Sequence, residues 1–181
     1  MQFRDALPDD AARVAALHAD SWRRHYRGAY SDAFLDGDVE SDRRSVWSAR
    51  LAARAGTATI LAESSEGGLL GFAHVRFDQD PRWGSLVDNL HVTNALRRTG
   101  IGRRLLALAA RSAASQASTR ALYLWVLEQN RAAQAFYLAS GAAHVETAIV
   151  DGDPARLNGT PRKLRMSWPD ASLFPGAAEA P

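Results

Sequence analysis

The residues best suited to chemistry in this chain lie in a glycine-containing loop between two apolar segments. Residues 86–92 predict a strand, and a helix is expected from Ile101 because apolar residues recur there at helical spacing. Between them stand two glycines flanked by arginines. Free N–H groups and the positive end of the dipole at a helix N-terminus attract anions, and glycine permits close backbone approach. We therefore expect a pyrophosphate site formed by Arg97, Arg98, Thr99, Gly100, Ile101, Gly102 and Arg103, with Arg104 beside it.

Two familiar phosphate loops do not fit this stretch. The dinucleotide fingerprint G-x-G-x-x-G fails because Leu105 stands at its third glycine position. The Walker loop fails because Gly102 is followed by Arg103 and Arg104 rather than by Lys and Ser or Thr. What remains is R-x-x-G-x-G between a strand and a helix, a pattern that a basic turn of purely structural role would also produce.

A second block lies downstream of this loop. Residues 121–127 form an apolar run of strand length, and a helix is expected over residues 131–140. Asn130 is a typical N-cap and Gly141 a typical residue just past the helix end. The block reads V-x-x-x-N-x-x-A-x-x-F-Y-x-x-x-G, carried by Val126, Asn130, Ala133, Phe136, Tyr137 and Gly141.

Together the two blocks resemble the conserved blocks of the GNAT superfamily, the acetyl-CoA-dependent N-acetyltransferases. The resemblance covers residues 1–168 and implies that the first loop binds the pyrophosphate of coenzyme A. It also implies that the central strand splays from its neighbour, so that amides around Leu90, His91 and Val92 grip the pantetheine arm and the thioester carbonyl. Asn130, Phe136 and Tyr137 would lie beside the coenzyme, although Asn130 has an equally good structural role as an N-cap.

Acyl transfer to an amine sets chemical requirements that can be matched to residues. A lysine-like amine has a pKa of about 10.4, so it must lose a proton before it attacks a thioester. The departing thiolate needs a proton from an acid of comparable pKa, and tyrosine, near 10, is suitable. Tyr137 matches the tyrosine that the family uses as general acid. Its alternative role is to pack a helix onto the sheet.

The general base is less clearly indicated. Many family members carry a glutamate early on the central strand, where this chain has Leu86. Asp88 is two residues on, and strand alternation would put it on the face of Leu86 and Leu90, with Asn89 and His91 on the other. Asp88 is our candidate base, directly or through a water, or else a substrate contact. His74 and Glu128 could also reach the cleft.

Aromatic residues recur every fourth position after the first predicted helix. They are Trp22, Tyr26, Tyr30 and Phe34, and packing around a helix–turn–helix is their simplest role. By resemblance, some would line an acceptor pocket. The residues that we predict to contact the acceptor are Trp22, Tyr26, Tyr30, His74, Asp88 and Asn89.

The pattern along the chain predicts one α/β domain with a mixed, mostly antiparallel sheet flanked by helices. Strands are expected at 2–7, 57–62, 69–77, 86–92, 121–127, 144–150 and 163–168, and helices after Pro8, over 31–37, over 39–55, from 101 and over 131–140. A chain of 181 residues is long enough for one well-buried domain and too short for two, so we expect a single domain, residues 1–168. Residues 169–181 are rich in proline and alanine and are expected to form a flexible tail.

Composition narrows the function classes further. The net charge of +2 does not argue for nucleic acid, and the basic residues form no stripe with interleaved aromatics. The chain has no cysteine, and its five histidines show no ligand spacing, so no metal is expected. There is neither an N-terminal signal core nor a membrane-length apolar run, which predicts a cytoplasmic protein. A homodimer through the aromatic helices or the last strands is compatible with the sequence.

These observations predict an acyltransferase that moves acetyl from acetyl-CoA to a primary amine by direct attack in a ternary complex. No covalent intermediate is implied, because the chain lacks a cysteine and a serine–histidine elbow. The acceptor would be a small molecule or a peptide amine. The alternative is a non-catalytic acyl-CoA-binding or regulatory module that keeps the coenzyme loop; the loss of the glutamate favours it, and the retention of Tyr137 argues against it.

Overall fold

The fold is a seven-stranded sheet in the order β1-β2-β3-β4-β5-β7-β6, seen in a computed structural model that describes residues 1–174. All neighbouring strands are antiparallel except the central pair β4 and β5. The strands are β1 (Gln2–Asp5), β2 (Thr57–Glu63), β3 (Leu69–Asp80), β4 (Gly84–Val92), β5 (Leu122–Leu127), β6 (Ala143–Ile149) and β7 (Arg162–Trp168). The predicted mixed α/β architecture is confirmed.

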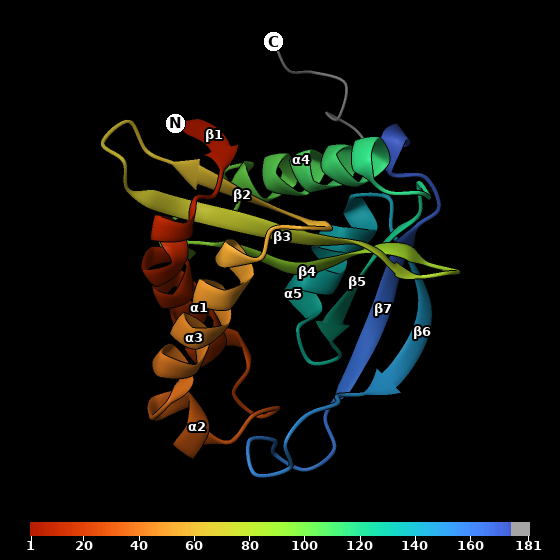
Figure 1. Ribbon diagram of the computed structural model, residues 1–181. Coiled ribbons are helices and arrows are strands. Elements are labelled where there is room, and N and C mark those ends of the chain that lie inside the picture. Colours follow the sequence, from red (N-terminus) through yellow and green to blue (C-terminus); the bar gives the residue numbers. More distant parts are fainter. Residues whose placement is uncertain (175–181) are drawn as a thin grey trace.

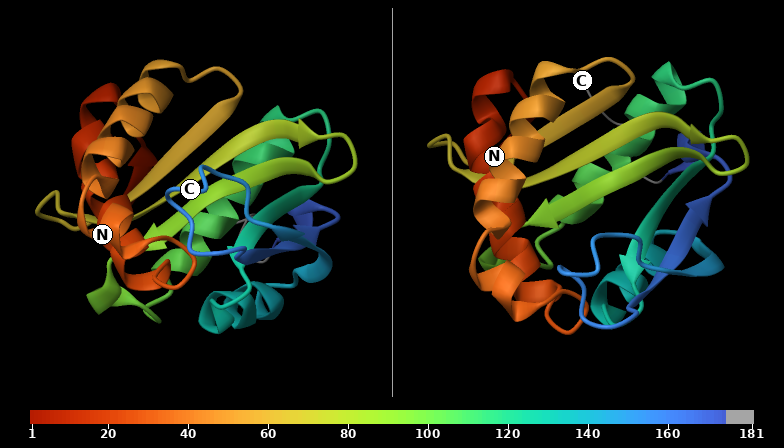
Figure 2. Two further views of the ribbon diagram at one scale, coloured as in Figure 1. Left: turned by 90° about the horizontal axis from the view of Figure 1, so that it is seen from below. Right: turned by 60° about the horizontal axis from the view of Figure 1, so that its bottom comes forward.

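Helices cover both faces of this sheet (Figure 1). On one face lies α4 (Ile101–Gln116), and on the other lie α1 (Ala11–His25) and α3 (Val39–Ala52), joined through the short α2 (Asp32–Asp36). The helix α5 (Arg131–Ala139) follows β5, and its Tyr137 belongs to the same hydrophobic cluster as α4. The views in Figure 2 show α1 and α3 beside the β2–β4 half of the sheet, with α5 beside the β5 half.

Alternation along the strands builds the two main cores. On β2, Ile60 and Ala62 pack in the α4 cluster, whereas Leu61 between them packs with Trp47 of α3. Consecutive side chains of a strand point to opposite faces, so both faces of β2 and β3 are buried. These strands therefore form a rigid platform for β4, to which β3 is paired along most of its length.

A β-bulge interrupts the pairing of β3 with β4. His74 is opposite Asn89, and the next pair is Val75 with Val87, so Asp88 is the extra residue. Val87 and Leu90 consequently both belong to the cluster under α4. Our expectation that Asp88 shares a face with both Leu86 and Leu90 is wrong, because the bulge breaks the alternation at Asp88.

The element boundaries differ from expectation at a few places. The first helix is preceded by a separate 3₁₀ turn, Pro8–Asp10, and β3 continues three residues past the predicted Phe77 to Asp80. The last described residues are packed rather than loose. Phe174 is 4% exposed and lies against Trp168, with ring centroids 5.9 Å apart. The ordered domain thus extends at least to Phe174, and the rest of the predicted tail, 175–181, lies outside the described residues.

Candidate active site

A deep cavity opens where the two central strands part. β4 and β5 are paired only at Ser85 with Leu122 and at Leu86 with Tyr123. Beyond these two pairs the strands diverge, and the space between them belongs to a cavity of about 840 Å³. Its walls come from α1, β4, the loop before α4, β5 and α5. A volume of this size lies in the range typical of ligand sites.

The backbone of β4 presents free amides to this cavity. Thr93 donates its N–H to the carbonyl of Leu70, which makes that pair a hydrogen-bonded one. Hydrogen-bonded and non-bonded pairs alternate in antiparallel sheets, so His91 turns its N–H toward β3 and Leu90 and Val92 turn theirs toward β5. Of the three predicted amides, those of Leu90 and Val92 therefore face the gap. The His91 amide belongs to the β3 ladder, although the residue itself lines the cavity.

The predicted pyrophosphate loop lies at the N-terminus of α4. Gly100 has a φ of +89° and Arg98 a φ of +65°, so the chain turns sharply just before the helix. Among residues 1–174 no side chain caps the helix, and its first backbone hydrogen bond runs from the Arg104 N–H to the Gly100 carbonyl. The N–H groups before Arg104 are therefore left for a ligand. Arg97, Arg98, Gly100, Gly102 and Arg103 line the cavity.

The other two residues predicted for this loop have supporting positions. Ile101 is buried in the core beneath α4. The Thr99 hydroxyl donates to the Leu96 carbonyl at 2.7 Å, which holds the loop closed. Their side chains shape the loop rather than line the cavity.

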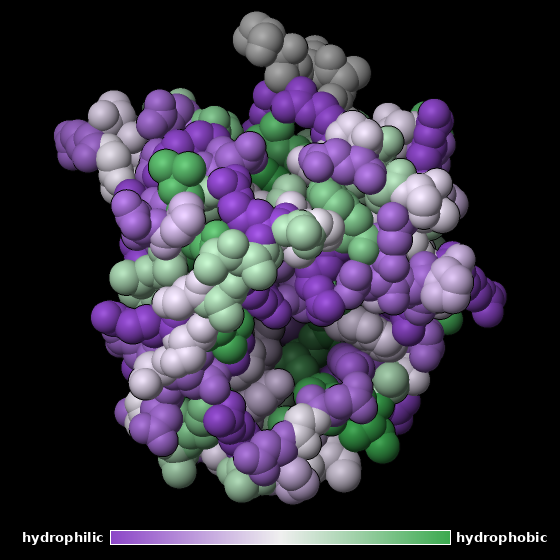
Figure 3. All heavy atoms as spheres, viewed as in Figure 1, coloured by the Kyte–Doolittle hydropathy of each residue, from purple (hydrophilic) through white to green (hydrophobic). Residues whose placement is uncertain are grey.

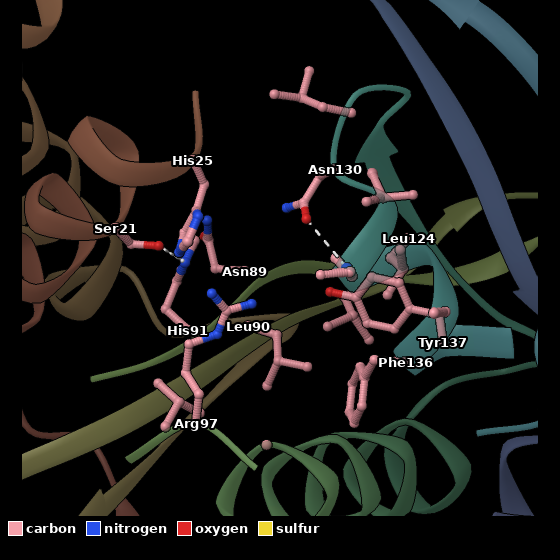
Figure 4. Close-up of a pocket in the computed structure, with 18 of the residues that line it drawn as sticks. Ser21, His25, Asn89, Leu90, His91, Arg97, Leu124, Asn130, Phe136 and Tyr137 are labelled. Carbon is pink, nitrogen blue, oxygen red and sulfur yellow. Dashed lines mark hydrogen bonds between the residues drawn. The ribbon is translucent and has the colours of Figure 1, made fainter. Parts of the chain in front are cut away.

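Tyr137 projects from α5 toward the gap between the strands (Figure 4). It is 9% exposed and packs edge-on against Phe136 and Trp168. Burial raises the pKa of its hydroxyl to about 12, so the group is protonated at neutral pH and can donate a hydrogen bond or a proton. Phe136 also lines the cavity, on the side of Gly102.

Asn130 caps α5, as its sequence position predicted. Its side-chain oxygen accepts from the Ala133 N–H at 3.1 Å, drawn as a dashed line in Figure 4. The residue lines the cavity as well, so the capping role and contact with a ligand are compatible. The cap fixes where α5 begins and hence where Tyr137 lies.

On β4, Asp88 and Asn89 are held together by an arginine from α3. Arg50 forms an ion pair with Asp88 Oδ2 at 2.6 Å and donates to Asn89 Oδ1 at 2.8 Å. Its guanidinium also stacks on Trp47, 5.2 Å from the ring centroid. Two adjacent strand residues would ordinarily point to opposite faces; the bulge at Asp88 lets one guanidinium reach both.

Three histidines, His91 on β4, His18 on α1 and His74 on β3, are held in the neutral form. Burial, followed by the positive potential of His25, lowers the pKa of His91 to about 3, and its Nδ1 lies 2.7 Å from the Ser21 hydroxyl. Burial also lowers the pKa of His18, which accepts a hydrogen bond from the Trp47 indole. His74 is 1% exposed and bonded to Thr59, so it does not reach the cavity, contrary to our expectation.

The aromatic series after α1 is a packed ladder with one member at the cavity. Trp22 and Tyr26 stack with ring centroids 4.8 Å apart, and Tyr30 and Phe34 continue the series. Tyr26 lines the cavity, whereas Trp22 and Tyr30 contribute to the packing around it. The packing interpretation therefore holds for most of the series.

Comparison with known proteins identifies the family. The family model described as "Acetyltransferase (GNAT) family" matches residues 19–142, more than half of the chain. The chain belongs to this family. It is an acyltransferase, and its fold is the one that the resemblance implied.

Individual proteins that resemble this GNAT acetyltransferase are also N-acetyltransferases by name. The "Uncharacterized N-acetyltransferase YuaI" of Bacillus subtilis (strain 168) is 27% identical over 174 residues, covering 94% of each protein. A ribosomal-protein-alanine N-acetyltransferase of Brucella melitensis has a TM-score of 0.69 at 22% identity, covering 93% of this chain and 99% of that one.

Two further solved structures contain the coenzyme. The PaiA N-acetyltransferase of Thermoplasma acidophilum, in complex with coenzyme A, has a TM-score of 0.67 at 16% identity, covering 92% of this chain and 98% of that one. The YncA structure of Salmonella typhimurium, with acetyl-CoA, has a TM-score of 0.65 at 19% identity, covering 100% and 96%. At these identities the likeness establishes the fold.

Several cavity residues of this acetyltransferase were not foreseen from its sequence. Ser21 and His25 enter from α1, and Trp125 enters from β5. Trp125 could have been found by applying alternation to residues 122–127, because Leu122, Leu124 and Val126 are the members that pack under α4. Arg50 carries no sequence signal, since its role depends on how α3 crosses β4.

Two kinds of feature are absent from residues 1–174 of this acetyltransferase. Within that range, no group of three or more His, Cys, Asp or Glu side chains is arranged to hold a metal ion. Nor do those residues include a helix of the length and apolarity needed to cross a membrane.

Proposed function

We propose that this enzyme transfers acetyl from acetyl-CoA to a primary amine by direct attack in a ternary complex. One observation carries the proposal: a single cavity is lined by the α4 loop, the freed edge of β4 and Tyr137. These are the parts needed to hold a pyrophosphate, to stabilise an oxyanion and to protonate a thiolate.

The coenzyme would lie between the α4 loop and the β4–β5 gap. Arg97, Arg98 and Arg103 would pair with its phosphates, together with the N–H groups at the start of α4. Acetyl-CoA supplies the activated acyl group. Asn130 and Phe136 line the other side of this path.

The transfer itself requires one bond to form and one to break. The amine nitrogen attacks the thioester carbon, and the C–S bond breaks as the tetrahedral intermediate collapses. The N–H groups of Leu90 and Val92 face the gap and are the donors best placed to stabilise the oxyanion. Tyr137, protonated at neutral pH, gives a proton to the departing thiolate.

Asp88 is our candidate for the group that receives the amine proton, directly or through a water. It lines the cavity and pairs with Arg50 through Oδ2 alone, while the structure records no side-chain hydrogen bond of Oδ1 within residues 1–174. His91 is a poorer candidate, because its Nδ1 lies 2.7 Å from the Ser21 hydroxyl and burial disfavours its protonated form.

The decisive experiment replaces Tyr137 by Phe. We expect kcat for amine-dependent release of coenzyme A to fall about 100-fold, because the hydroxyl is lost while the ring packing is kept. Tyr123→Phe is the matched control, since Tyr123 is buried on β5 outside the cavity lining. An unchanged kcat in Tyr137→Phe would remove Tyr137 from the mechanism.

The wild-type assay separates this proposal from a non-catalytic acyl-CoA-binding module. Calorimetric titration measures acetyl-CoA binding, and a broad amine panel measures turnover. Binding without turnover of any amine would favour the module. Amine-dependent turnover would exclude it.

A further inference from the structure

The wide end of the β4–β5 cleft is closed by two loops that join across it. We call residues 150–158 and the segment 27–31 that they contact the latch. Ser31 donates its N–H to the Arg156 carbonyl, and Asn158 donates its N–H to the Ala29 carbonyl, both at 2.9 Å. Gln129, which follows β5, donates its side-chain amide to the Arg27 carbonyl at 2.7 Å.

Side chains reinforce these backbone bonds. Arg156 forms an ion pair with Asp42 of α3 at 2.7 Å and stacks over Phe34, 4.8 Å from the ring centroid. Beneath them an apolar cluster contains Ala29, Leu127, Val150 and Leu157, together with Tyr26 and Tyr30. The loop after β6 is therefore tied to the α1–α3 layer by hydrogen bonds, charge and burial at once.

Because of the latch, the cavity does not open as a continuous groove on this face. Figure 1 shows the loop between β6 and β7 meeting the segment between α1 and α2 below the sheet. Figure 3 shows a bounded hollow in the same view, enclosed on its lower side by this loop. The face with α1 and α3 is opposite the one covered by α4, so an acceptor has its own entrance, separate from the α4 loop.

The charges around this entrance are already paired within the protein. Asp88 pairs with Arg50, Asp42 with Arg43 and Arg156, and Asp151 with Lys163. A second or third ammonium group of a ligand would therefore find no unpaired carboxylate among these three. Polycation binding needs such carboxylates, because a charge already neutralised by an arginine attracts a further cation weakly.

The aromatic wall of the entrance is likewise occupied by cations. Trp125 lines the cavity, and its ring is contacted by Lys163 at 4.7 Å and by Arg165 at 4.6 Å from its centroid. Both cations are themselves ion-paired, Lys163 with Asp151 and Arg165 with Asp80 and Glu146, and they already use the cation–π attraction of this ring, so a ligand ammonium would gain little from Trp125. Uncharged apolar groups do not depend on that attraction and can pack against Trp125, Tyr26 and Leu127.

We propose that the latch and the paired charges restrict the acceptor to a small primary monoamine with an uncharged, apolar body. This inference rests on the proposed acetyltransferase activity and specifies its second substrate. The bounded entrance excludes a lysine on a folded protein surface. Because Asp88 is neutralised and Trp125 is already contacted by paired cations, the extra ammonium groups of polyamines and basic peptides find no favourable partner.

A competition among three amines tests the inference. Initial rates of coenzyme A release are measured at saturating acetyl-CoA with phenethylamine, spermidine and a short lysine-rich peptide. We expect kcat/KM for phenethylamine to exceed the other two at least tenfold. A preference for spermidine or for the peptide would overturn this inference and leave the proposed function intact. Turnover of no amine at all would overturn both.

A pair of variants at Lys163 then tests the electrostatic part. Lys163→Gln removes one cation from Trp125 and breaks its ion pair with Asp151, whereas Lys163→Arg keeps the positive charge. We expect the glutamine variant to move the phenethylamine-to-spermidine ratio about threefold toward spermidine, and the arginine variant to keep the wild-type ratio. Raising the salt concentration should bring the wild-type phenethylamine-to-spermidine ratio closer to one, because salt screens the charges. Equal ratios in both variants and at both salt concentrations would show that the paired charges do not select the acceptor.

Discussion

The two ends of the cavity differ in what they leave for a ligand. At the α4 end, Arg97, Arg98 and Arg103 face the space, and within residues 1–174 the structure records no ion pair for any of them. At the α1–α3 end, Asp88 and Asn89 already share Arg50. The α4 end is open to a charged ligand, whereas at the α1–α3 end the charged side chains already form ion pairs within the protein.

This difference indicates how binding energy is divided between the two substrates. The α4 end can bind a pyrophosphate with few new rearrangements, because its helix N-terminus and cations are already in place. The α1–α3 end must select its ligand by shape and by apolar contact. The coenzyme site should therefore be sensitive to charge at single positions, and the acceptor site should be sensitive to the pairings that hold it.

The largest effect is expected from reversing charge at the α4 end. Gly102→Glu would place a carboxylate among the arginines and the free N–H groups, and we expect the Kd for coenzyme A to rise about 100-fold or more. Gly102→Ala is the matched control. A Cβ at Gly102 would lie 3.6 Å from Val92 and 3.9 Å from Phe136, which are ordinary contacts, so the alanine variant should bind within about threefold of wild type.

Calorimetric titration of both variants with coenzyme A measures this difference. If the alanine variant lost binding as completely as the glutamate variant, the loop would be sensitive to any side chain. The charge argument for the α4 end would then fail. If neither variant lost binding, the coenzyme would have to lie elsewhere.

Acid pH should lower the stability of the α1–α3 end before that of the α4 end. Burial lowers the pKa values of His18, His74 and His91, the last two to about 4 and about 3, so the folded state disfavours their protonation. The unfolded chain takes up protons near pH 6.5, and the stability that the neutral forms contribute above that pH is lost as the pH falls below it. One such histidine accounts for about 2 kcal/mol between pH 6.5 and 5.

Urea unfolding at pH 7.5 and pH 5 measures this loss. Asp10 and Glu63 should contribute little, because their ordinary pKa values lie below 5 and Arg4 lowers them further in the folded protein, so both groups are largely ionised at pH 5 whether the chain is folded or unfolded. We expect His74→Gln to show a smaller loss than wild type, and the exposed His144→Gln to show the same loss as wild type. Hydrogen exchange at pH 5 should rise in α1 and β4 before α4; faster exchange in α4 would contradict the comparison.

The sequence allowed the loop at the α4 end and the start of α5 to be predicted, because their determinants are local. The glycines, the arginines and the N-cap Asn130 act within a few residues of where they stand. The acceptor end depends on contacts between distant segments. The bulge at Asp88, the reach of Arg50 from α3 and the latch between residues 31 and 156 each need the folded arrangement to exist.

The same reasoning explains the error at the C-terminus. The stretch 169–181 as a whole is rich in proline and alanine, which have little to bury, and this average hides Leu173 and Phe174 near its start. The packing of Phe174 depends on Trp168, whose ring also meets Tyr137. Composition alone does not show that one aromatic residue, Phe174, packs against a buried aromatic residue, Trp168.

The smallest of these effects is expected where Arg50 positions the acceptor end. Arg50→Gln removes the ion pair with Asp88 and weakens the hold on Asn89, so we expect kcat/KM for the amine to fall about tenfold. The Kd for coenzyme A should stay within twofold of wild type, because Arg50 is not among the residues that line the cavity. Steady-state rates and calorimetric titration measure the two quantities separately.

Arg44→Gln is the control for this experiment, since Arg44 is an exposed arginine on the same helix. It should keep wild-type rates. A thermal melt of Arg50→Gln checks that losing the stacking on Trp47 has not unfolded α3. If Arg50→Gln lowered coenzyme binding as much as amine turnover, the two ends of the cavity would be coupled through β4. The division between an open coenzyme end and a pre-paired acceptor end would then have to be given up.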